Sequence, residues 1–225
     1  KIITKVFNFL TRKMNKFTIV QFAGGTKVPL DNTIIFSCAG SYLSEIGKDS
    51  FYVPIPLVSK NHNQVHIENK KYKVGFVGRD THTCRQKMVE QLSGLKDYNI
   101  KTVNDYNNIS EFESIMNNSI FSLCPRGTSP TSFRLYEALE MGSIPIYISD
   151  EFWLPFKDYI NWEEFCIFVK PDSIDKIPFI VDSLIKESKH IEMIVKGKEA
   201  FNKFFTMEKV SEEIIKYLSN TNEKN

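Results

Sequence analysis

The sequence predicts an α/β protein with a mostly parallel sheet and helices as crossover connections. From Phe17 onward, short apolar runs rich in Ile, Val and Phe alternate with helical patterns. The 225 residues suffice for one full domain and part of a second. With 42% hydrophobic and 25% charged residues, the composition is that of a folded chain and excludes disorder as the main state.

Seven apolar runs predict strands, at residues 18–22, 34–37, 73–77, 100–103, 120–123, 144–148 and 165–169. Six amphipathic patterns predict helices, at residues 83–95, 111–117, 130–141, 175–187, 191–204 and 208–218. A further amphipathic pattern, at residues 1–14, predicts a core-facing helix or the border of a removed signal or anchor. Two boundaries carry specific signals. They are the Ser110–Glu113 capping-box spacing and a helix start at Ser129-Pro130 with a stop at Gly142.

The polar stretch at residues 59–71, which follows Pro54 and Pro56, predicts a linker. We therefore expect three parts: a partial N-terminal α/β portion with its linker at residues 1–70, a Rossmann-like domain at 71–206, and a C-terminal helix with a polar tail at 207–225.

The charge balance limits the partners that the chain can bind. Twenty-nine Lys and Arg against 27 Asp and Glu leave a net charge of +2, which excludes nucleic acid and an anionic membrane surface as the chief partner. Uncharged stretches such as residues 17–26 are far shorter than the ~20 residues that cross a bilayer, so we expect no membrane span.

The cysteines and two of the histidines are predicted to have no catalytic or metal-binding role. The four cysteines are widely spaced and predict buried free thiols, with a disulfide left open for a secreted chain: Cys38, Cys84, Cys124 and Cys166. His62 and His66 lie in the polar linker without a third metal ligand, which predicts surface side chains.

The first candidate binding loop follows the expected strand at 73–77. Ligands of an open α/β sheet bind beyond the carboxyl ends of its strands. Here Gly78 would let a backbone approach a ligand closely, and the next helix offers free N–H groups and Arg85 to an anion. The absence of Gly-Lys-Ser/Thr excludes a Walker loop.

The second loop lies between the expected strands at 120–123 and 144–148 and predicts a right-handed βαβ unit. Thr131 and Ser132 would place hydroxyls and free amides at the mouth of its helix, with Arg134 in the first turn. Together with Arg85 this mouth predicts a diphosphate pocket.

Each candidate also has a plainer interpretation. Glu137 could accept hydrogen bonds from the vicinal hydroxyls of a ribose, or form an ordinary i,i+3 ion pair with Arg134. Arg85 and Arg126 could be solvated surface charges. Asp150, just past a strand, could contact a sugar or cap its own loop.

A series of motifs in fixed order closely resembles the C-terminal half of exostosin-family glycosyltransferases. The motifs are Val53-Pro, the Gly75–Gly78 strand end with Arg85, Cys124-Pro, Ser129-Pro-Thr-Ser-Phe-Arg-Leu-Tyr-Glu-Ala, Gly142-Ser-Ile-Pro, Ile148-Ser-Asp, Leu154-Pro-Phe, Trp162 and the run at 165–169. The resemblance covers residues 48–170.

The resemblance implies a GT-B fold with two Rossmann-like domains, of which the N-terminal, acceptor-binding one is incomplete here. It implies an inverting glycosyltransferase that moves a sugar from a nucleotide-sugar, a UDP-sugar, to a glycan or other hydroxyl acceptor. The motifs leave the compartment open between the Golgi lumen and the cytoplasm, depending on the source. By carry-over, Arg85, Ser132 and Arg134 match donor-diphosphate positions, and Glu137 matches the ribose-binding acid. Gly78, Arg126 and Asp150 complete the set of donor-site candidates; no catalytic base is named.

No Asp-x-Asp pair occurs, so arginines and the helix dipole would neutralise the leaving diphosphate, and we expect no metal and no cofactor. Two alternatives stay open. One is a non-catalytic nucleotide-sugar-binding subunit, or a truncated family member, that needs a partner chain. The other is another GT-B enzyme, such as a sugar-nucleotide epimerase.

Overall fold

The computed structural model describes the greater part of the chain. Described are residues 16–22, 25–26, 29–40, 47–58, 62, 70–104 and 109–222. The helix expected at residues 1–14, His66 and most of the linker expected at 59–71 lie outside these segments.

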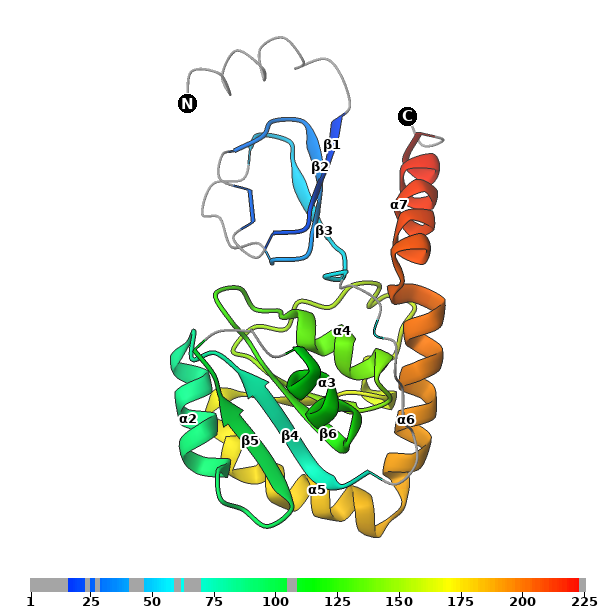
Figure 1. Cartoon of the computed structure of the whole chain (residues 1–225). Helices are drawn as coiled ribbons and strands as arrows, with labels where there is room; N and C mark the ends of the chain where they lie inside the picture. Colours follow the sequence, from blue (N-terminus) through cyan, green and yellow to red (C-terminus); the bar gives the residue numbers. More distant parts are fainter. Residues whose placement is uncertain are drawn as a thin grey trace.

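Two parallel sheets form the frame (Figure 1). The strands are β1 Lys16–Val20, β2 Thr33–Ser37, β3 Phe51–Pro54, β4 Tyr72–Gly78, β5 Tyr98–Thr102, β6 Ser119–Pro125, β7 Ile144–Ile148 and β8 Ile167–Val169. One sheet has the order β1-β2-β3 and the other β5-β4-β6-β7-β8, and every pairing is parallel. This is the predicted α/β fold class.

Helices cover both faces of the five-stranded sheet. The α-helices are α2 Thr83–Leu92, α3 Ile109–Asn117, α4 Phe133–Glu140, α5 Ile177–Lys186, α6 Lys189–Ala200 and α7 Met207–Asn222. Successive side chains of a strand point to opposite faces, so Ile146 joins a core with Met88 of α2 and Val181 of α5. Tyr147 joins the second core, with Met116 of α3 and Leu135 of α4.

The second core continues into the three-stranded sheet. Helix α7 lies alongside that sheet (Figure 1), and the rings of Tyr217 and Phe36 meet edge to face at 5.6 Å. Trp153 Nε1 donates to Ser37 O at 2.8 Å. The two sheets therefore share one buried layer.

The seven predicted strands are confirmed, and no end moves by more than two residues. Strand β3 was not predicted. The predicted capping box is wrong, because α3 begins at Ile109 and Ser110 lies inside the helix. Helix α4 starts three residues later than expected, since Pro130 packs against Gly40, which follows β2 of the other sheet, and its carbonyl accepts from Tyr147 Oη.

The Gly142 stop is confirmed. Helix α4 ends at Glu140, and Gly142 follows with a φ of 62°, the left-handed conformation that glycine adopts without strain. The helix expected at 191–204 ends as α-helix at Ala200 and continues as a π-helix at Phe201–Phe205.

All four cysteines are buried and free, as predicted. Burial raises the pKa of Cys38 and Cys84 to about 11. Within the described ranges, every helix is too short or too polar to serve as a membrane-crossing segment.

Candidate donor site

The candidate residues gather at the carboxyl edge of the five-stranded sheet. Strand β5, the next strand in the chain, lies on one side of β4, whereas β6 and β7 lie on the other side of β4. The gap beyond β4 and β6 is therefore the point where strand order reverses, and such a point holds the ligand in open α/β sheets.

Arg85 fills the floor of this gap. Its side chain is 5% exposed, and its guanidinium donates to the carbonyls of Arg126 at 2.9 Å, Arg79 at 2.9 Å and Pro125 at 3.2 Å. The first turn of α2 carries Arg85 into this position, where it ties the loop after β4 to the loop after β6. The surface-charge interpretation of Arg85 is wrong.

Arg126 is also buried, at 3% exposure, so its surface-charge interpretation is wrong too. It directly follows β6, its backbone N–H donates to Ile148 O at 2.8 Å, and its Nη1 pairs with the carboxylate of Asp150. This hydrogen bond holds the pKa of Asp150 below its usual value. Asp150 itself is 62% exposed, so the pair forms a rim that faces solvent.

The amino end of α4 presents a polar group that has no partner among the described residues. Ser132 is the N-cap residue, with an extended backbone at φ −147°, but its hydroxyl makes no capping bond. The hydroxyl oxygen of Ser132 is buried and lacks a hydrogen-bond partner in the described part of the protein, whereas the Thr131 hydroxyl interacts with the buried Tyr136 side chain. A helix N-terminus with such an unpartnered hydroxyl suits an anion.

Arg134 lies in the first turn of α4 and is 4% exposed. Its Nη2 donates to Val77 O at the end of β4, its guanidinium carbon is 4.7 Å from the ring centre of Phe76, and its Nε is buried without a partner. Gly78 makes room for it, because a Cβ there would come within 2.8 Å of Arg134 Nη2.

Glu137 does not pair with Arg134, so that interpretation is wrong. Its Oε1 lies 3.7 Å from His62 Nε2. The prediction of His62 as a surface residue is also wrong: its side chain is 10% exposed, and its Nδ1 lies 2.8 Å from Glu113 Oε1. His62 lies far from Glu113 and Glu137 in the sequence, so residue spacing carries no signal for their contact.

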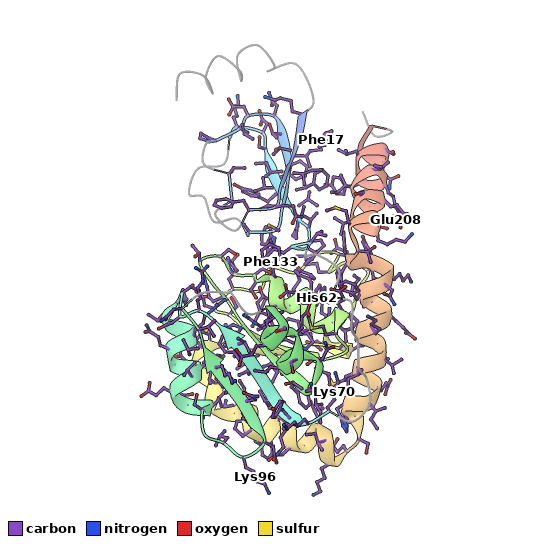
Figure 2. All side chains as sticks on the ribbon, viewed as in Figure 1. Phe17, His62, Lys70, Lys96, Phe133 and Glu208 are labelled. Carbon is purple, nitrogen blue, oxygen red and sulfur yellow. The ribbon has the colours of Figure 1, made fainter. Side chains whose placement is uncertain are left out.

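Figure 2 shows Phe133 and His62 in the region between the two sheets. Phe133 is 44% exposed and immediately follows the N-cap of α4.

A cavity of about 350 Å³ opens beside Gly78 on the α2 side, lined by Phe76, Gly78, Arg79, Asp80, Arg85, Gln86, Val89, Glu90 and Thr102. No group of His, Cys, Asp and Glu among the described residues is arranged to hold a metal ion, and metal independence stays a prediction.

Comparison with protein families gives a match to the exostosin GT47 domain over residues 7–184. A rice (Oryza sativa subsp. japonica) protein named "Probable glucuronosyltransferase" is 46% identical over 69 residues, which are 31% of this chain and 17% of that protein. The Arabidopsis thaliana protein named "Probable beta-1,4-xylosyltransferase IRX10" is 43% identical over 72 residues, 32% of this chain and 18% of that protein. The aligned part is thus less than a fifth of either relative.

Among solved structures, a chain of the GtfA/B complex superposes with a TM-score of 0.57 at 12% identity, covering 97% of this chain and 55% of that one. The two sheets and their helices therefore have the GT-B arrangement, as the sequence predicts.

Proposed function

Since the chain belongs to the exostosin GT47 family, we propose that it is the donor-binding part of a glycosyltransferase that uses a UDP-sugar and inverts the configuration at the anomeric carbon. One observation supports the donor site above all. Two buried donor groups without hydrogen-bond partners, Ser132 Oγ and Arg134 Nε, belong to the N-cap and the first turn of α4. Unsatisfied buried donors cost free energy unless a ligand accepts from them.

The proposed ligand at this mouth is the donor diphosphate. The α4 N-terminus and the Arg134 guanidinium favour a dianion through the helix dipole and charge-assisted hydrogen bonds. Arg85 contributes indirectly: by tying the two loops together it fixes the walls of the gap. Glu137, one turn further along α4, would accept from the ribose hydroxyls.

The reaction follows from this placement. An acceptor hydroxyl of a glycan, deprotonated by a base, attacks the anomeric carbon in line as the bond to the diphosphate oxygen breaks. Negative charge then develops on the leaving diphosphate at the α4 mouth. Donors already oriented toward that charge stabilise it in the transition state more than in the ground state. The protein thus supplies orientation and electrostatic stabilisation, with no metal required.

The variant Arg134→Lys tests the site. Lysine keeps the charge but cannot reproduce two parallel bonds of a planar fork. Because charge-assisted bonds contribute about 1.5–3 kcal/mol each, we expect UDP binding to weaken about tenfold to a hundredfold. Titration calorimetry with EDTA present measures this change.

Uridine is the matched ligand control, because it lacks the diphosphate and should bind both proteins equally. Equal UDP affinities in a folded Arg134→Lys protein would remove Arg134 from the site. If another nucleoside diphosphate binds in place of UDP, the donor class changes. Binding that requires manganese would contradict the metal-independent proposal.

A further inference from the structure

His62 comes from the segment between the two sheets and is anchored on the helices of the donor site. Its backbone N–H donates to Glu140 Oε1 at 2.9 Å. Its ring contacts Glu113 of α3 at 2.8 Å and lies 6.2 Å from the ring of Phe112. Arg134 lies over that same phenyl ring, at 5.6 Å. His62 and Arg134 therefore share Phe112 as a neighbour.

The groups around His62 are mainly acidic. Glu113 faces it from α3, and Glu137 and Glu140 face it from α4. Glu137 first, and then Glu113 and Glu140, raise the pKa of His62 to about 9 against the opposing effect of burial. The ring is therefore an imidazolium at neutral pH, with an N–H on both nitrogens.

The nearby cations bind elsewhere. Lys198 of α6 donates to Glu140 O, and Lys70 donates to the carbonyls of Asn117 and Met141. Neither hydrogen bond is to a carboxylate of Glu113, Glu137 or Glu140, and among the ion pairs of the described residues it is His62 that contacts Glu137.

The contact between His62 and Glu137 is incomplete. Nδ1 is satisfied by Glu113, but Nε2 is buried without a hydrogen-bond partner, and 3.7 Å to Glu137 Oε1 is too long for one. The geometry leaves one N–H of the imidazolium, without a hydrogen-bond partner, beside a carboxylate whose side chain is 16% exposed.

We propose that His62 is a positioning residue that orients the Glu137 carboxylate toward the ribose hydroxyls of the donor. This inference rests on the proposed function. The positive charge of the imidazolium attracts Oε1 across 3.7 Å, and the other oxygen, Oε2, remains to accept from the ribose. His62 would thereby connect the segment between the sheets to the nucleoside.

The test compares two ligands on two proteins. UDP carries the vicinal hydroxyls, and 2′,3′-dideoxy-UDP lacks them while keeping the base and the diphosphate. For the wild type we expect UDP to bind about three- to tenfold tighter than the dideoxy ligand, the value of one hydrogen bond. In His62→Asn this ratio should fall toward one, with the dideoxy affinity unchanged.

A structural role alone would lower the unfolding temperature of His62→Asn and leave the ratio as in the wild type, and that result would overturn the proposal. The variant Glu113→Ala removes the Nδ1 partner without changing Glu137 and should lower the ratio in the same direction. His190→Asn is the matched control: His190 lies on α6 with its ring near Leu184 O of α5, and its ratio should equal that of the wild type.

The same measurements distinguish a failure of the proposed function from a failure of the role proposed for His62. A wild-type protein that binds neither UDP nor pyrophosphate would overturn both ideas. Wild-type binding of UDP with a ratio near one would overturn only the role of Glu137 and His62.

Discussion

Two of the three buried arginines at the carboxyl edge of the five-stranded sheet, Arg85 and Arg134, differ in what surrounds their guanidinium groups. In the gap beyond β4 and β6, Arg85 donates to three backbone carbonyls. In the first turn of α4, Arg134 makes one such bond and leaves Nε buried without a hydrogen-bond partner. Both side chains are about equally buried.

The number of hydrogen bonds that each guanidinium already makes indicates which arginine is suited to bind a ligand. A donor that already holds a carbonyl gains little by exchanging it for a phosphate oxygen, whereas an unsatisfied donor gains a whole hydrogen bond. Arg85 therefore holds the backbone of the two loops in place, whereas Arg134 retains an unsatisfied donor that can bind a ligand.

The largest expected effect is on stability, from Arg85→Met. The change leaves three buried carbonyls without their donor, and we expect the free energy of unfolding to fall by about 2–4 kcal/mol. Urea denaturation measures it. Lys96→Met is the control, because it removes an exposed charge at the far end of the sheet and should change little (Figure 2). A stable Arg85→Met protein with weakened UDP binding would reverse the comparison of the two arginines.

Next in size is the effect of Gly78→Ala. The new methyl would meet Arg134 Nη2 at 2.8 Å and Phe76 Cζ at 2.9 Å, so Arg134 must move away from Val77 O. We expect UDP to bind about tenfold more weakly, with a loss of about 1–3 kcal/mol in stability from overpacking. Calorimetry and urea denaturation give the two values.

Gly127→Ala is the matched control for Gly78→Ala, since its methyl would meet Arg85 Nη2 at an ordinary 3.4 Å. It should keep nearly wild-type stability and UDP affinity. If both alanine variants weaken UDP alike, the two arginine regions are not functionally distinct.

The smallest effect concerns the rim and depends on pH. Because Arg126 lowers the folded-state pKa of Asp150, this pair stabilises the fold above the unfolded pKa of about 3.9, and the contribution is lost as pH falls through the lower folded value. Asp150 is 62% exposed, so Asp150→Asn should cost under about 1 kcal/mol at pH 7. Its unfolding curve should converge with that of the wild type as the pH falls through the lowered folded-state pKa.

Asp172→Asn serves as the control for the rim, because Asp172 pairs with Lys87 at 93% exposure and should have no measurable effect. A cost for Asp150→Asn that stays constant down to pH 2 would show that the charge of Asp150 is not what stabilises the rim.

Particular elements show how far the sequence could be read. Residues 144–148 form a run of buried apolar side chains, and the strand prediction there is confirmed exactly as β7. Strand β3 was missed because its four residues, which end in Pro54, carry little pattern of their own and become a strand by pairing with β2. The assignment of residues 1–70, 71–206 and 207–225 to three parts stays a prediction.

The candidate site also has features of both kinds. The α/β alternation, the glycine stop at Gly142 and the grouping of polar residues after strands can be read from the sequence, because they depend on local period and turn chemistry. Three contacts depend on the folded chain: Arg85 binds three carbonyls, Arg134 keeps an Nε without a partner, and His62 faces Glu137. Each of these contacts joins residues that are at least six positions apart in the sequence, and most join residues that are dozens of positions apart. Local patterns carry no signal for such pairs, because a donor is satisfied only if the fold brings a carbonyl or carboxylate within about 3.5 Å of it.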